Sequence, residues 1–127
     1  MLNKTTIKIG FYTYAISLAA GSLLNINQAH QTNILIQDKL IHYLAYLILC
    51  LILFLYLKTH HKKDKLSTCV AFSLIFGTIL ELLQPAMTTT RVFDPYDLIA
   101  NALGVFTSAL IIFRNKKSIV KKLETFM

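Results

Sequence analysis

The stretch ELLQPAMTTTRVFDPYDLIANALG, residues 81–104, determines how the rest of the chain is interpreted. It carries four ionisable side chains, Glu81, Arg91, Asp94 and Asp97, and an apolar run long enough to lie in lipid flanks it on each side. In a soluble protein such charges would be solvated surface. Between two membrane spans, ionisable side chains are costly, and they therefore indicate a functional site.

Four apolar blocks make up most of the 127-residue chain, which is 55% hydrophobic and has a mean hydropathy of +0.57. The blocks predict membrane spans at about residues 7–26, 38–57, 66–84 and 96–113, because each is close to the roughly 20 residues that cross a hydrocarbon layer of about 30 Å. We expect an all-α fold, a four-helix transmembrane bundle. It would form one domain, residues 1–127, with a long outer loop between spans three and four.

The thirteen basic residues predict the orientation of this bundle. With four spans and a cytoplasmic N-terminus, eleven of them lie on the inner side and only Lys39 and Arg91 on the outer side. The asymmetry is typical of the positive-inside rule. We therefore expect both termini in the cytoplasm and a multipass protein of the inner (cytoplasmic) membrane.

The formal net charge of +7 does not indicate nucleic-acid binding, because no stacking aromatic residues interleave the cations. The basic tail, residues 114–122, is instead expected to touch the anionic headgroups of membrane lipids.

Three of the spans each place polar side chains on one helix face, at spacings of three or four residues. The stripes are Asp38, His42 and Tyr46 in the second span, Ser73, Gly77, Glu81 and Gln84 in the third, and Asp97, Asn101, Gly104 and Ser108 in the fourth. Residues at these spacings share one side of a helix. We expect the stripes to converge at the outer end of the bundle, because each charge facing lipid would cost a few kcal/mol.

Small residues predict where the helices pack closely. Ala100, Gly104 and Ser108 form a small-residue seam, and Gly77 allows a neighbouring helix to approach, as in other membrane bundles. Cys50 and the later Cys69 are expected to be buried packing residues without a disulfide.

The segment between the third and fourth spans is expected to begin where Pro85 ends the third helix, and to run for about twelve residues, a length typical of functional loops. Val92 and Phe93 should fold back on the bundle. Asp94 and Pro95 should start the fourth helix as its N-cap and first residue.

Three further local features follow from the same reasoning. Asp38 is placed to cap the second helix, where its charge suits the helix dipole. The polar segment 25–37 is expected to form an outer loop. Asp94 is expected to pair with Arg91, which lies three residues before it in the sequence.

Three motifs occur in order between residues 38 and 104, about half of the chain. They are D-K-x-x-H-x-x-x-Y (Asp38, Lys39, His42, Tyr46), E-x-x-Q (Glu81, Gln84) and R-x-x-D-x-x-D-x-x-x-N-x-x-G (Arg91, Asp94, Asp97, Asn101, Gly104). In this order they resemble the VanZ-like family. That family is named for an accessory protein of glycopeptide-resistance clusters that lowers sensitivity to teicoplanin, so the resemblance implies a membrane protein of the cell envelope.

One hypothesis is that the outer site binds a phosphate- or sugar-bearing lipid or another envelope precursor. The five-donor fork of Arg91 suits a phosphate or a carboxylate. The carboxylates and amides could accept hydrogen bonds from sugar hydroxyls. The candidate binding residues are Asp38, Lys39, Tyr46, Gln84, Arg91, Asp94, Asp97 and Asn101.

A second hypothesis is a membrane-embedded hydrolase or transferase that acts on a lipid-linked substrate. His42, oriented by Asp38, would be the catalytic base and Glu81 the catalytic acid. No cofactor is required, but a divalent cation held by Glu81, Asp94 and Asp97 is a variant, because hard cations prefer oxygen ligands.

A third hypothesis is structural, with the charges forming a network that locks the loop onto the bundle. The sequence leaves the choice among these hypotheses open. It also leaves open whether the chain forms a homo-oligomer and whether its first span is a cleaved signal peptide.

Overall fold

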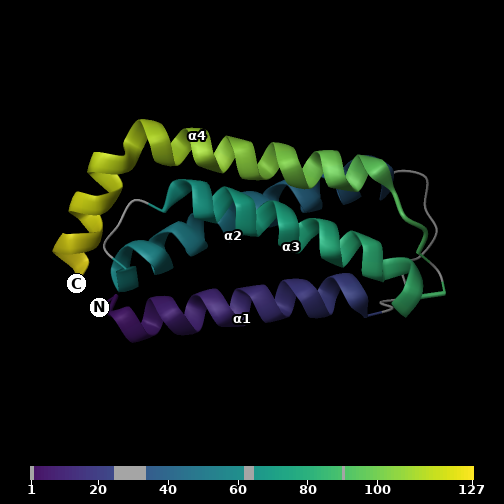
Figure 1. The fold of residues 1–127 in the computed structure, drawn as a ribbon, viewed down its shortest axis with the longest axis horizontal. Helices are drawn as coiled ribbons and strands as arrows, with labels where there is room; N and C mark the ends of the chain where they lie inside the picture. Colours follow the sequence, from purple (N-terminus) through teal and green to yellow (C-terminus); the bar gives the residue numbers. More distant parts are fainter. Residues whose placement is uncertain (1, 25–33, 62–64, 90) are drawn as a thin grey trace.

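The computed structural model describes residues 2–24, 34–61, 65–89 and 91–127, and these residues form four α-helices joined by short connections (Figure 1). The helices are α1 (Lys4–Leu23), α2 (Ile34–His61), α3 (Leu66–Met87) and α4 (Pro95–Phe126). No strand occurs in the described part of the chain. The predicted all-α fold is confirmed. Most of the predicted outer loop, residues 25–33, lies outside the described residues.

Three of the four helices are long and apolar enough to cross a membrane, by length and composition: Ile36–His61, Leu66–Met87 and Pro95–Phe126. The chain is therefore a multipass membrane protein. The first helix is not among the three, since its start carries Lys4 and Lys8 and hydroxyl side chains interrupt its apolar residues. The span at residues 7–26 and the cytoplasmic placement of the termini stay predictions.

Consecutive helices run in opposite directions, so the bundle has two distinct ends (Figure 1). At one end, called the site end here, α1 and α3 finish and α2 and α4 begin. At the other, called the termini end, lie the N-terminus and the C-terminus. The ionisable members of the three polar stripes lie at the site end because they occupy the beginning of α2 or α4 or the last turns of α3.

Two of the predicted helix boundaries are wrong, and each has a local cause. Helix α3 continues through Pro85 to Met87, because a proline in the last turn removes only one ladder hydrogen bond. Thr88 closes the helix, with both its backbone N–H and its hydroxyl donating to the Gln84 carbonyl at 2.9 Å. Helix α2 begins at Ile34, so Asp38 lies in its second turn and does not cap it.

The start of α4 follows the prediction. Asp94 is the N-cap, its Oδ1 accepts from the backbone N–H of Tyr96 at 2.9 Å, and Pro95 is the first helical residue. The connection between α3 and α4 therefore runs only from residue 88 to residue 94, shorter than the predicted twelve residues.

Val92 and Phe93 do not fold back on the bundle as expected, since their side chains are 84% and 38% exposed. No backbone hydrogen-bond ladder holds this segment against the bundle. Its polar neighbours, described below, make the contacts that attach it.

Helices α2 and α4 approach each other closely at Gly104. A Cβ added to this glycine would lie 2.1 Å from the backbone oxygen of Tyr43. Gly77 plays a similar role on α3, because a Cβ there would lie 2.7 Å from the ring of Tyr46. Ala100 and Ser108 are also buried, so the predicted small-residue seam is confirmed as the surface that lets two backbones touch.

Apolar packing continues from this seam toward the termini end. The buried cluster includes Phe11 of α1, Leu49 and Phe54 of α2, Cys69 of α3 and Ile112 of α4. All four helices therefore share one core. Cys50 and Cys69 are buried free thiols, as predicted.

We predict that Gly104→Ala destabilises the bundle by about 1–3 kcal/mol, the range for overpacked cores, because the new methyl group would collide with the Tyr43 carbonyl. The matched control is Gly10→Ala, where a Cβ meets nothing within 4 Å; it should stabilise α1 by roughly 0.5–1 kcal/mol. Thermal unfolding in detergent, followed by circular dichroism, measures both. Equal melting temperatures for Gly104→Ala and the unchanged protein would contradict the close contact.

Candidate functional site

The polar stripes of α2, α3 and α4 converge at the site end. His42, Glu81, Gln84, Asp97 and Asn101 are each between 1% and 8% exposed. They come from three different helices, and hydrogen bonds or ion pairs join them. The structure thus brings together residues that are up to 59 positions apart in the chain.

The imidazole of His42 lies at the centre of this cluster. Its Nδ1 is 3.0 Å from Oδ1 of Asn101 and 3.2 Å from Oε1 of Glu81. Because the Asn101 atom is an amide oxygen, which accepts, a hydrogen on Nδ1 satisfies this contact. Nε2 lies 3.8 Å from a carboxylate oxygen of Asp38 and 3.8 Å from one of Asp97, beyond hydrogen-bond distance. This nitrogen can therefore still accept or donate a hydrogen bond.

The sequence predicted that Asp38 orients His42, whereas in the structure other residues hold the ring. Asn101 and Glu81 hold the ring through Nδ1. Asn101 also donates from Nδ2 to Glu81 Oε1 at 3.2 Å, so the two residues fix each other. Sequence spacing favoured Asp38 because it lies one turn from His42 on the same helix. Which residues of α3 and α4 lie beside His42 follows only from the three-dimensional packing of the helices.

A second series of contacts leads from Glu81 to the connection between α3 and α4. With the Gln84 amide oriented to satisfy both neighbours, its nitrogen donates to Glu81 Oε2 at 3.2 Å and its oxygen accepts from Nη1 of Arg91 at 3.1 Å. Arg91 is therefore linked to His42 through two buried side chains. The predicted pair of Arg91 with Asp94 does not form.

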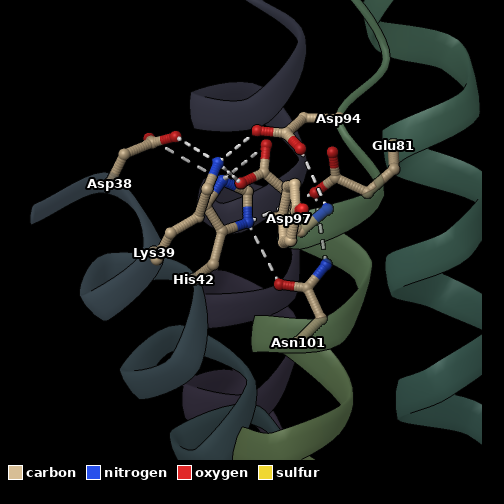
Figure 2. Close-up of polar contacts among 8 residues, drawn as sticks. Asp38, Lys39, His42, Glu81, Asp94, Asp97 and Asn101 are labelled. Atoms are coloured by element: carbon tan, nitrogen blue, oxygen red, sulfur yellow. Dashed lines mark hydrogen bonds and ion pairs between the residues drawn. The ribbon is translucent and has the colours of Figure 1, made fainter. Parts of the chain in front are cut away.

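Asp94 instead pairs with Lys39, whose ammonium lies among three carboxylates (Figure 2). Lys39 Nζ is 2.5 Å from Asp94 Oδ2 and 3.5 Å from Asp38 Oδ2, and it donates to Asp97 Oδ1. The side chains of Lys39, Asp38 and Asp94 are 27%, 23% and 33% exposed, while Asp97 is almost covered. This ion cluster, defined as Lys39, Asp38, Asp94 and Asp97, ties α2 to the start of α4.

The ammonium of Lys39 also changes the pKa of Asp94, which lies outside the predicted spans. Its hydrogen bond to Lys39 holds the pKa of the Asp94 carboxyl below its usual value, and the backbone N–H of Tyr96 acts in the same direction. Asp94 is therefore ionised over the physiological pH range.

Tyr46 lies one turn below His42 and is 1% exposed. Its ring packs on Gly77. Among the described residues its hydroxyl has no hydrogen-bond partner, and the same holds for the hydroxyls of Ser73 and Ser108 in the stripes of α3 and α4. Tyr46 thus does not join the hydrogen-bond network of the polar cluster, although it lines the cavity described next.

A cavity of about 210 Å³ lies beside the cluster, between α1 and α2. Its lining includes Asp38 and His42 of α2, Arg91 of the connection, and small residues of α1. Glu81, Asp94, Asp97 and Asn101 are not among the lining residues.

The contribution of α1 is the part of the site that the sequence analysis missed. Ser17, Gly21 and Ser22 line the cavity opposite Asp38 and His42. The available signal was the run of small residues Ala19-Ala20-Gly21-Ser22 near the site end of the helix. Small side chains leave an unfilled space where larger ones would pack against α2.

The structure also changes the set of residues suited to a divalent cation. Among the described residues, Asp38, His42 and Asp97 offer ligand atoms within 4.8 Å of one another. The predicted set of Glu81, Asp94 and Asp97 is not gathered in this way, because Glu81 faces Asn101 and Gln84. The Lys39 ammonium already supplies positive charge to Asp38 and Asp97.

A model of the family described as VanZ/LLP1 matches residues 3–119, which include α1, α2, α3 and most of α4. No curated protein and no solved structure matches the chain.

We predict that Lys39→Gln lowers the free energy of unfolding by about 1–3 kcal/mol at neutral pH, less than the 3–5 kcal/mol of fully buried pairs because the partners are partly solvated. The depressed pKa of Asp94 means that its ion pair stabilises the fold above the unfolded pKa of about 3.9. That stability is lost as the pH falls through the lower folded pKa. The difference between the two proteins should therefore shrink on acidification.

Thermal unfolding in detergent between neutral pH and about pH 3 tests this dependence. Lys39→Arg is the matched control, since it keeps the positive charge. A stability difference that stays constant down to the lowest pH would contradict the role of the Lys39–Asp94 pair.

Proposed function

The chain belongs to the VanZ/LLP1 family, and from that premise we propose that it is a cell-envelope protein of the inner membrane that binds the polar headgroup of a phosphate- or sugar-bearing lipid or envelope precursor. The cavity between α1 and α2 carries the proposal. The binding site is on the outer side, where the positive-inside rule places the site end.

The size of the cavity supports a headgroup as ligand. Pockets for drug-sized molecules measure about 300–1,000 Å³, and this one measures about 210 Å³. It has room for a phosphate or a sugar ring but not for the acyl chains. Those chains would remain in the surrounding lipid, which a membrane-spanning protein contacts on every side.

The lining residues offer complementary chemistry for such a headgroup. Arg91 presents a guanidinium to the cavity, and guanidinium groups bind phosphate through two parallel hydrogen bonds. Asp38 and Nε2 of His42 can accept hydrogen bonds from sugar hydroxyls. Ser17 and Ser22 add hydroxyl groups from α1.

We extend the proposal to the phenotype for which the family is named. A protein that holds an envelope precursor at the outer surface would lower sensitivity to teicoplanin by changing the precursor's availability to the antibiotic. The phenotype depends on the site, so substitutions that block the cavity should remove it.

We predict that Gly21→Leu weakens headgroup binding tenfold or more, because a leucine side chain would occupy the cavity. Gly21 lines the cavity, and a Cβ there meets nothing within 4 Å, so the helix itself tolerates the change. Gly10→Leu is the matched control: it makes the same substitution in the same helix, away from the cavity and with equal space. Native mass spectrometry with a polyprenyl phosphate and a glycolipid as probes measures binding.

The same pair of variants, expressed in a teicoplanin-sensitive host, tests the phenotype. Gly21→Leu should abolish the tolerance that Gly10→Leu retains, at equal protein levels. Undiminished probe binding by Gly21→Leu would remove the cavity from consideration. If Gly21→Leu, Arg91→Lys and Asp94→Asn lower tolerance only in proportion to protein level, the charges serve to lock the connection onto the bundle.

A second candidate function, a hydrolase or transferase acting on a lipid-linked substrate, is favoured by one observation. Nε2 of His42 lies beyond hydrogen-bond distance of Asp38 and Asp97, and His42 lines the cavity, so this nitrogen could take a proton from a bound hydroxyl or water. Glu81 does not reach the cavity. In this mechanism it would position His42 through Nδ1 and would not protonate the substrate directly.

If the second function holds, we predict that the purified protein converts an envelope lipid into a product detectable by mass spectrometry, and that His42→Gln slows this by roughly 10²–10⁴-fold, the usual contribution of a general base. His60→Gln is the control, because His60 is an exposed histidine near the other end of the same helix. If the protein binds the probes but forms no product from any envelope lipid class, the catalytic function is contradicted and only the binding function remains.

A further inference from the structure

We propose that the last turns of α4 form a second, independent interaction surface that binds the headgroups of anionic phospholipids. This surface, called the α4 tail, comprises residues 114–126. It lies at the termini end, opposite the end of the bundle where α2 and α4 begin (Figure 1).

The tail begins where the lipid-facing part of α4 ends. Phe113 is 74% exposed, as suits a side chain facing acyl chains, and Arg114 follows it directly. The part of α4 before the tail, residues 95–113, is about 28 Å long at 1.5 Å per residue, close to the roughly 30 Å of the hydrocarbon layer. The tail therefore extends into the headgroup layer.

The tail bends back across the end of the bundle. In Figure 1 the yellow turns leave the direction of the rest of α4 and run toward the N-terminus. Ile119 packs against the hydrophobic core, and Val120 and Leu123 are half-buried on the same side. The apolar face of the tail thus packs against the bundle and holds the tail at the termini end.

The opposite face of the tail is basic. Arg114, Lys117 and Lys121 lie three and four residues apart, so they share one side of the helix, and together with Lys122 they are exposed. Glu124 is the only acidic residue between residues 114 and 127. An amphipathic helix with an apolar face and a cationic face is suited to a membrane surface.

Charge complementarity and position identify the occupant. Lys4 and Lys8 of α1 are exposed at the same end of the bundle, and they add positive charge beside the tail. Phe126 is 55% exposed, which lets an aromatic ring enter the interface beside the cations. Anionic phospholipid headgroups are the negatively charged groups that surround a membrane protein at this depth.

The test compares the full-length protein with Lys117→Gln/Lys121→Gln/Lys122→Gln by native mass spectrometry from detergent containing equal amounts of phosphatidylglycerol and phosphatidylcholine. The unchanged protein should retain phosphatidylglycerol in preference. The triple variant should lose that preference by roughly a hundredfold, since each cation near the surface contributes about fivefold. Added salt should weaken the preference in the same direction.

Two controls separate this surface from the cavity. The charge-conserving triple variant with arginine at the same three positions should keep the preference. Gly21→Leu should also keep the tail-dependent difference, because it alters only the cavity. Equal retention of the two lipids by the unchanged protein would overturn the proposal and would point to a soluble acidic partner. An unaltered preference in the glutamine variant would also overturn it.

Discussion

The ammonium of Lys39 among the carboxylates of Asp38, Asp94 and Asp97 is the interaction on which the site end depends. Three carboxylates near one another would repel if none of them had a counter-charge. Lys39 supplies that charge from α2 to the connection and to α4 at once. It therefore fixes the position of the start of α4 relative to α2. The position of Asp97 beside His42 follows from this.

This ion cluster is possible only because α2 and α4 touch along their backbones. Gly104 lies two turns below Asp97 and permits contact with the Tyr43 carbonyl. Tyr43 is next to His42, so the close contact also brings Asn101 within hydrogen-bond distance of the imidazole. A larger residue at position 104 would move these helices apart and separate the site residues without altering any of them.

Helical periodicity was sufficient to predict which residues would meet, but not which would pair. The spacing of Glu81 with Gln84 and of Asp97 with Asn101 placed each pair on one face, and burial then required those faces to converge. The partner of Asp94 could not be found in this way. Arg91 is nearer in sequence, yet the N-cap geometry directs Asp94 toward α2 and Lys39. Likewise, α1 has no polar stripe, and its small residues contribute by leaving space.

The charges around the cavity constrain how a headgroup would lie in it. Asp38 and Arg91 are among its lining residues, so the lining carries a negative group and a positive group at separate places. A phosphate placed next to Asp38 would be repelled, whereas Arg91 offers it a favourable position at the cavity. Hydroxyl groups, which can donate to carboxylates and to Nε2 of His42, suit the opposite side. Under the proposed binding function, a ligand with a hydroxyl-rich group and a phosphate on adjacent parts of one headgroup would match this polarity.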